Sequence, residues 1–108
     1  MSKRVFLATR DLLFRSKLGA VVTAAGGEVS RDEKECDLVV LEVADPGAPE
    51  RIAELVGRGI PVLAYGAHVR PELLRTAREA GALAVPNSQV EERLRELLTP
   101  QGRSTLRP

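Results

Sequence analysis

The sequence predicts a three-layer α/β sandwich, in which helices cover both faces of a five-stranded parallel β-sheet. Short apolar runs alternate along the chain with segments of helical periodicity, which is the order that βα units produce. Hydrophobic residues make up 44% of the 108-residue chain, enough for one ordinary core and too few for two. We therefore expect a single domain over residues 1–98, followed by a flexible tail over residues 99–108 that has no periodicity.

Five segments have the composition of strands. Residues 38–43 and 60–65 are continuous apolar runs, which are typical of parallel strands buried on both faces. Residues 5–8 form a shorter run of the same kind that ends in polar side chains. Brief strands are expected over residues 28–30 and 82–85, and each directly follows a glycine.

Four segments have helical spacing and recognisable ends. The first covers residues 12–25, with Asp11 available as its N-cap. The second and third cover residues 49–56 and 71–80, and each begins near a proline, which lacks the N–H that a first helical turn leaves unpaired. Residues 88–91 read Ser-Gln-Val-Glu, a capping box that opens a last helix ending near residue 98.

Charge and cysteine content exclude several classes of function. Sixteen basic and fifteen acidic residues give a net charge of +1, so the strong positive charge of a nucleic-acid-binding domain is missing. The only cysteine, Cys36, has no partner for an internal disulfide or a metal cluster, which favours a reducing compartment. Neither a signal peptide nor an apolar run long enough to span a membrane is present. We expect a cytoplasmic protein that binds no metal, membrane or nucleic acid.

The expected sheet also locates the functional site. In open α/β sheets, ligands bind beyond the carboxyl ends of the strands. The residues that follow these ends are Thr9, Arg10 and Asp11, then residues 42–45, residues 66–68 and residues 86–88.

Several of these segments resemble the receiver domain of bacterial response regulators, including the stand-alone chemotaxis regulator. Residues 37–42, Asp-Leu-Val-Val-Leu-Glu, resemble the strand that ends in the phosphoaccepting aspartate, and Pro46 follows at the family's spacing. Residues 61–67 and 80–82 resemble the fourth strand and the approach to the fifth. The resemblance covers residues 5–98 and implies a flavodoxin-like fold with strand order 2-1-3-4-5.

The same resemblance implies a degenerate phosphorylation site. A receiver holds Mg²⁺ with two acidic residues after its first strand, and this chain has Arg10 and Asp11 there. Glu42 stands in place of the phosphoaccepting aspartate. The phosphoryl-binding hydroxyl, the conserved lysine and the switch aromatic of the family are replaced by Gly66, Ser88 and Val85.

Two further features of the chain leave open what fills the site. Arg10 either bridges Glu42 and Asp11 through forked hydrogen bonds, in place of Mg²⁺, or points into solvent. The family's second helix is missing, because only six residues separate Ser30 from Asp37. One edge of the sandwich is then exposed or covered by a partner.

We interpret the chain as a phosphorylation-independent, receiver-like module in bacterial signalling that binds another protein, is no enzyme, needs no cofactor, and is a monomer or homodimer. The expected contact surface is residues 71–98, which receivers commonly use. Two alternatives remain. Asp11 or Asp45 accepts phosphate in an atypical phosphorelay, or the crevice senses a small molecule. Four residues are expected on the crevice rim, namely Thr9, Asp45, Tyr65 and His68.

Overall fold

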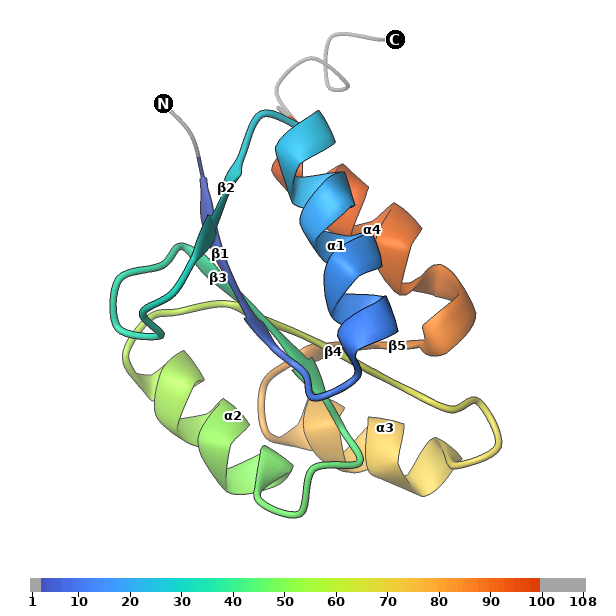
Figure 1. Ribbon diagram of the computed structural model, residues 1–108. Helices are drawn as coiled ribbons and strands as arrows, with labels where there is room; N and C mark the ends of the chain where they lie inside the picture. The colour runs from blue at the N-terminus through green and yellow to red at the C-terminus, as the bar shows by residue number, and fades with distance from the viewer. Residues whose placement is uncertain (1–2, 100–108) are drawn as a thin grey trace, which may run out of the picture.

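A parallel sheet of five strands runs through the centre of the computed structural model, which describes residues 3–99 (Figure 1). The strand order is β2-β1-β3-β4-β5, as the resemblance implies. Each βα connection is long enough to bring the next strand in parallel to its neighbour. The strands are β1 (Arg4–Ala8), β2 (Glu28–Ser30), β3 (Leu38–Glu42), β4 (Val62–Gly66) and β5 (Leu83–Pro86).

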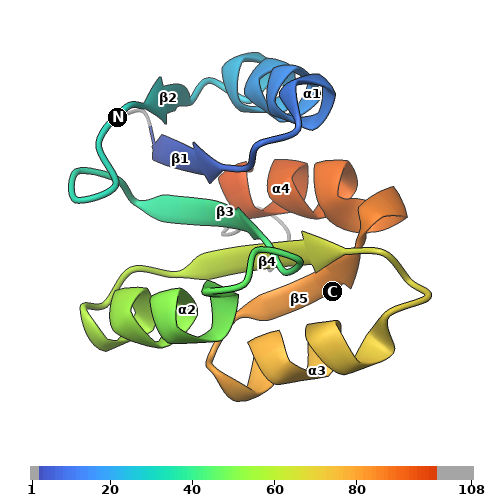
Figure 2. The same ribbon diagram turned by 60° about the horizontal axis from the view of Figure 1, so that its bottom comes forward.

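Helices cover both faces of this sheet. In Figure 2, α1 and α4 lie on one face, and α2 and α3 lie on the other. The predicted three-layer sandwich is therefore confirmed. The four helices are α1 (Leu12–Ala24), α2 (Ala48–Gly57), α3 (Pro71–Glu79) and α4 (Val90–Leu98).

The sheet separates the core into two apolar clusters, because successive side chains of a strand point to opposite faces. Along β3, Leu38 and Val40 belong to the cluster under α1 and α4, whereas Val39 and Leu41 belong to the cluster under α2 and α3. No residue of β4 is exposed. The two central strands are buried on both faces, as their continuous apolar runs predict.

Helix starts follow the sequence signals in part. The carboxylate of Asp11 accepts from the backbone N–H groups of Leu13 and Phe14 at 2.9 and 3.2 Å, so the predicted N-cap of α1 is confirmed. Pro71 is the first residue of α3, as expected.

The predicted capping box at the last helix is wrong. Ser88 lies inside a 3₁₀ turn, η1 (Asn87–Gln89), and α4 begins after it at Val90, without a side-chain cap. Pro86 is the last residue of β5 and has an extended backbone, so the chain needs this tight turn before it can enter the helix. Glu91 is then in the first turn of α4, and the structure shows no hydrogen bond between it and Ser88.

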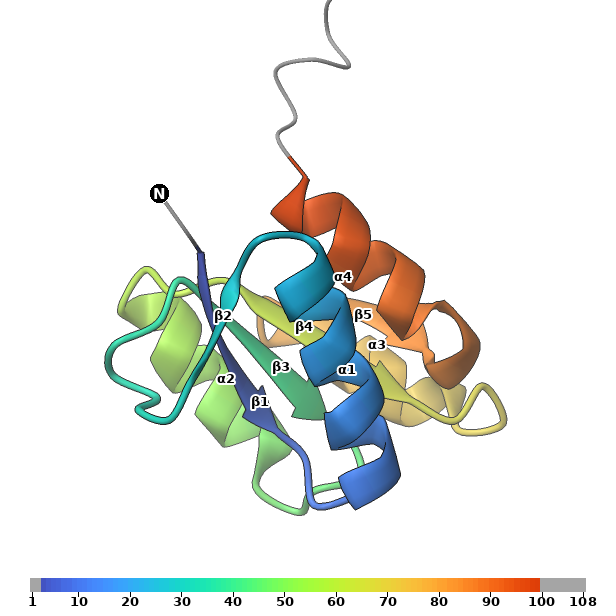
Figure 3. The same ribbon diagram turned by 45° about the horizontal axis from the view of Figure 1, so that its top comes forward.

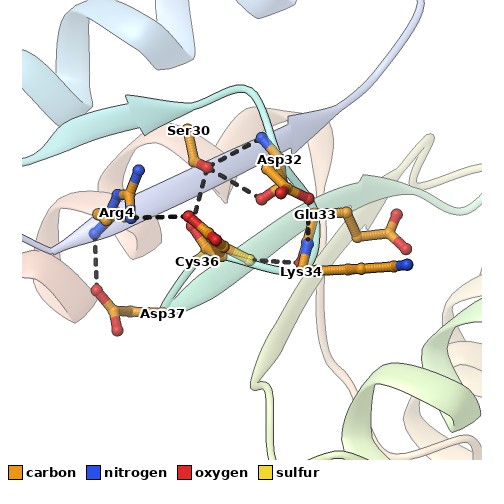
Figure 4. A network of polar contacts seen from close by, with 8 residues as sticks. Arg4, Ser30, Asp32, Glu33, Lys34, Cys36 and Asp37 are labelled. Atoms are coloured by element: carbon orange, nitrogen blue, oxygen red, sulfur yellow. Dashed lines mark hydrogen bonds and ion pairs between the residues drawn. The ribbon is translucent and has the colours of Figure 1, made fainter.

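The link between β2 and β3, residues 31–37, contains no helix, so the predicted loss of the second receiver helix is confirmed. Hydrogen bonds hold this loop in shape (Figure 4). The Ser30 hydroxyl lies 3.0 Å from the carbonyl oxygens of both Asp32 and Glu35. The Arg4 N–H donates to the Asp37 carboxylate at 2.8 Å. The loop therefore has a defined, hydrogen-bonded structure, although it is much shorter than a helical crossover.

The loop is also tied to α2, which lies beside it in Figure 3. Arg51 of α2 forms an ion pair with Glu33 of the loop, and its guanidinium lies 6.0 Å from the centre of the Phe6 ring. Cys36 is half-buried in the same loop, its thiol donates to the Glu33 carbonyl, and burial raises the pKa of this thiol. Arg51 thus links α2 both to this loop and to Phe6 of β1.

No helix within residues 3–99 is long and apolar enough to cross a membrane. The predicted tail falls on residues 99–108, and all of it except Thr99 lies outside the described part of the chain.

Candidate functional site

A crevice of about 680 Å³ opens at the carboxyl edge of the sheet, where the expected site lies. The strand β1 and the turn into α1 form one wall, and the end of β3 with the turn that follows forms the other. One side chain of α1 and one of α2 complete it. The lining residues are Phe6, Leu7, Ala8, Thr9, Arg10, Asp11, Arg15, Glu42, Ala44, Asp45, Pro46 and Arg51.

Thr9 joins the crevice to the core below it. Its hydroxyl oxygen accepts a 2.6 Å hydrogen bond from the hydroxyl of Tyr65. The Thr9 hydroxyl in turn donates to Oε1 of Glu42 at 3.3 Å, and its oxygen also accepts from the Asp11 N–H at 3.3 Å. The strand order β1-β3-β4 brings these residues together, because they lie at the same end of three neighbouring strands. Thr9 is thus the centre of a polar network, whereas the sequence predicts only a polar strand end.

The prediction that Tyr65 lies on the crevice rim is wrong. Its side chain is 1% exposed and packs in the core cluster under α1 and α4, with the Phe14 ring centre 5.0 Å away. Burial raises the pKa of Tyr65 to about 12, since water no longer solvates the phenolate, although the hydrogen bond with Thr9 acts in the opposite direction. Tyr65 therefore stays neutral and serves as a hydrogen-bond donor beneath the crevice.

The two carboxylates nearest the network already have structural partners. Glu42 is half-buried and accepts from Thr9, while the carboxylate of Asp11 caps α1. Asp45, in the turn after β3, is half-buried on the same wall as Glu42, and its side chain makes no hydrogen bond or ion pair with residues 3–99. Within residues 3–99, no group of three or more His, Cys, Asp or Glu side chains could hold a metal ion.

Arg10 does not bridge the carboxylates. It is exposed and forms no ion pair or hydrogen bond with any residue of the described chain, so the second of the two sequence-based alternatives is the correct one. The reason is local, because Thr9 and the first turn of α1 already hold the acids that Arg10 would need. Arg15 lines the same crevice and is likewise exposed and unpaired within residues 3–99.

Val43 packs so closely against Gly66 that a side chain at this glycine would meet it. A Cβ atom added at Gly66 would overlap Cγ2 of Val43, and it would also approach Leu74 at 3.7 Å. Val43 is itself 5% exposed and packed in the core. A serine or threonine side chain at this position therefore has no room unless Val43 moves.

The remaining predicted positions do not line the crevice. Ser88 and His68 are exposed on the turns after β5 and β4. Val85 is 5% exposed inside the cluster under α1 and α4. The crevice thus gathers five of the predicted residues, which are Thr9, Arg10, Asp11, Glu42 and Asp45.

Sequence reasoning missed Phe6, Arg15 and Arg51 as lining residues. Phe6 lies inside β1, where a buried strand residue is the ordinary interpretation. Its side chain is nevertheless only half-buried and lines the crevice. The predicted exposed edge was the available signal, since it places part of β1 next to solvent.

Comparison with solved structures identifies the architecture. A response regulator from Thermotoga maritima superposes with a TM-score of 0.74 and 15% identity, over 91% of this chain and 98% of that one. The receiver domain of response regulator 1452 from Francisella gives 0.67 and 15%, over 95% and 99% of the two chains. The chain has the receiver fold. No family model matches the sequence, and no curated protein matches it significantly.

The receiver fold also occurs as one part of longer proteins. This chain superposes on NtrX from Brucella abortus with a TM-score of 0.71 and 15% identity, over 97% of its own length but only 29% of NtrX. Identities this low establish the fold alone. What the crevice does must be argued from its own residues.

Proposed function

We propose that this receiver-fold chain is a phosphorylation-independent module of bacterial signalling, located in the cytoplasm, that acts by binding another protein. The observation that carries the proposal is the packing of Val43 against Gly66. Receivers place a hydroxyl residue at this strand end to hold the incoming phosphoryl group. Here a core side chain occupies that space, so phosphoryl transfer would lack both the hydroxyl and the room for one.

The acidic groups support the same proposal. Phosphoryl transfer depends on positioning and on cations that neutralise charge on the transferred oxygens. Glu42 is one methylene longer than aspartate and accepts from Thr9, and Asp11 is the N-cap of α1. Arg10 stands where a second metal-binding acid is expected, and it is exposed without an ion pair to any residue in 3–99. A crevice built this way has a reduced capacity to hold Mg²⁺ beside an acceptor.

A direct test is incubation of the full chain with acetyl phosphate and Mg²⁺, followed by intact-mass measurement. Transfer to a carboxylate would release acetate and add about 80 Da, the mass of a phosphoryl group. We expect no adduct. An adduct on Asp11 or Asp45 would reject the proposal in favour of an atypical phosphorelay. The variants Asp11→Asn and Asp45→Asn then identify the acceptor.

The crevice itself favours a second candidate, the sensing of a small molecule. Its volume of about 680 Å³ lies in the range of ligand pockets, and two of its lining residues, Arg10 and Arg15, are exposed cations without an ion pair to any residue in 3–99. A thermal-shift screen with nucleotides and phosphorylated metabolites tests this candidate, because a ligand that binds only the native state raises the melting temperature. A rise that Arg10→Ala and Arg15→Ala abolish would support it, and a flat screen would reject it for these compounds.

A further inference from the structure

The helix α1 differs in charge from the other three helices. Its sequence, Leu-Leu-Phe-Arg-Ser-Lys-Leu-Gly-Ala-Val-Val-Thr-Ala, contains two cations and no acid. Each of α2, α3 and α4 mixes glutamates with arginines. Mixed charges are what a solvated helix face ordinarily carries. The outward side of α1 is therefore unlike the other solvent-facing helical surfaces of the described chain.

Two adjacent leucines at the start of α1 are unusually exposed. Leu12 is 75% exposed and Leu13 is 65% exposed, although the rest of the apolar residues in α1 are buried or half-buried, apart from alanines. Ser16 and Ala20 follow on the same side of the helix, at the three- and four-residue spacing that stacks side chains along one face. This stripe combines large apolar groups with small ones and carries no charge.

Cations flank the stripe, and the structure gives them no partner. Arg10, Arg15 and Lys17 are exposed and form no ion pair with any residue between 3 and 99. Asp11 is the only acid nearby in sequence, and its carboxylate already accepts from two backbone N–H groups of α1. The exposed start of α1 is thus apolar in the middle and positive on its borders.

We propose that this surface, the α1 docking face of Arg10, Leu12, Leu13, Arg15, Ser16 and Lys17, binds an acidic amphipathic segment of a protein partner. The inference rests on the proposed function and names the surface and the chemistry of the partner. Leucines on the partner would cover Leu12 and Leu13, while its glutamates or aspartates would meet the cations. Complementary charges at the rim of an apolar patch fix the orientation of a partner and speed its association.

Charge also argues against a second copy of the chain as the occupant. A two-fold symmetric contact would place the same patch on both sides of the interface. The cations of one copy, Arg10, Arg15 and Lys17, would then meet the equally positive patch of the other copy, with no unengaged acid in either docking face. An acidic partner has no such penalty.

The test is a titration of the full ¹⁵N-labelled chain, followed by NMR, with a defined synthetic peptide. The peptide is an 18-residue helix with leucines on one side and glutamates on the other, and the control peptide has lysine at each glutamate. We expect the glutamate peptide to shift amide signals of residues 10–20 in a saturable way, and the lysine peptide to leave them unchanged. Added salt should weaken binding, because screening reduces the attraction between exposed charges.

Matched variants separate the docking face from a general effect of exposed side chains. Leu12→Gln with Leu13→Gln should weaken peptide binding by about tenfold or more, as expected when two leucines lose their buried apolar area. Val69→Gln is the control, because Val69 is 69% exposed on the turn before α3 and lies outside the docking face. Arg15→Glu should weaken binding more than Arg75→Glu, which changes an exposed arginine of α3. Unchanged circular dichroism in each variant shows that the fold is retained.

Three outcomes would overturn the inference. The first is the absence of saturable shifts, or shifts that map to other elements. The second is an equal loss of binding in the Val69 and leucine variants. The third is binding to phosphatidylserine-containing vesicles through residues 10–20 without binding to the peptide, which would assign the surface to a membrane. Each outcome is independent of the acetyl phosphate test, so the docking face can fail while phosphorylation independence stands.

Discussion

The side chains on the two sides of β1 are buried to different extents. On the α1 and α4 side, Val5 and Leu7 are 0% and 4% exposed beneath two helices. On the α2 and α3 side, Phe6 and Ala8 are only half-buried, and the Arg51 guanidinium lies 6.0 Å from the centre of the Phe6 ring. The receiver fold therefore tolerates incomplete burial of one side of β1, while the side under α1 and α4 is fully closed.

Truncation of a core leucine should give the largest loss of stability. It tests the packing of the sheet face under α1 and α4. Leu94 of α4 is 0% exposed in the cluster under α1 and α4. Leu94→Ala should lower the free energy of unfolding by about 2–5 kcal/mol, through lost apolar burial and the cavity that remains. The half-buried Leu73 of α3 is the matched residue on the other face, and Leu73→Ala should cost less. Urea denaturation measures both, and equal losses would contradict the comparison.

A hydroxyl residue at the end of β4 should be destabilising. Gly66→Thr forces its side chain against Val43, and overpacking of this kind costs about 1–3 kcal/mol. Val43→Ala should be destabilising alone yet should recover part of the stability when combined with Gly66→Thr. Thermal unfolding of the two single variants and the double variant gives the coupling. Strict additivity would show that Val43 does not exclude the hydroxyl.

Removal of the hydrogen bond between Tyr65 and Thr9 should lower the free energy of unfolding. Thr9→Val leaves the buried Tyr65 hydroxyl without its acceptor, an unsatisfied group that costs about 1–3 kcal/mol. Tyr65→Phe should recover part of that loss in the Thr9→Val background. Chemical denaturation of the four proteins in this cycle measures the coupling. A coupling near zero would mean that the polar network does not support the α1 and α4 face.

Tyr65 should also make stability depend on alkaline pH. Its folded-state pKa is raised to about 12 from the ordinary 10.0, mainly by burial. A raised pKa means that the folded state favours the protonated phenol, so its contribution is complete below pH 10 and is lost as the pH rises through about 12. Tyr65 is the only tyrosine and tryptophan is absent, so ultraviolet absorbance reports its titration directly. Tyr65→Phe should remove this part of the pH dependence.

The contacts of Arg51 with the loop over residues 31–37 and with Phe6 should contribute least to stability. Arg51→Ala removes the ion pair with Glu33 and the contact with Phe6, and partly exposed pairs of this kind are worth about 0.5–1 kcal/mol. Arg51→Ala should change the local opening of the loop more than the global free energy of unfolding. Hydrogen exchange should speed up over residues 31–37, whereas Arg75→Ala should leave these amides unchanged. Faster exchange throughout the sheet would instead make Arg51 a global support.

Patterns that are local in sequence predicted the fold well. The apolar runs of β3 and β4, the N-cap at Asp11 and the proline at the start of α3 all act within a few residues, and each is found where expected. The resemblance to receivers added the strand order. The capping box at Ser88 failed because the backbone after Pro86 turns tightly before α4 begins, a constraint that the motif itself does not contain.

The details of the site could not be predicted in this way. Tyr65 and Thr9 are 56 residues apart and meet only because their strands are both next to β3. The lack of room for a side chain at Gly66, beside Val43, depends on the register of β3 against β4, whereas the sequence shows only a glycine at this strand end. The sequence leaves two positions open for Arg10, because the groups that bind Glu42 and Asp11, the Thr9 hydroxyl and the first turn of α1, reach them only in the folded chain.

The most direct test of phosphorylation independence is an NMR titration of the ¹⁵N-labelled chain with Mg²⁺ and beryllofluoride, a mimic of the phosphoryl group. The signals to follow are the backbone amides of Thr9, Asp11 and Val43, which border the crevice or the position of Gly66. Loss of the acceptor geometry and of the hydroxyl position predicts no saturable shift at these amides. A saturable shift that requires both Mg²⁺ and beryllofluoride would show that the crevice still holds a phosphoryl group, and would contradict the proposed function.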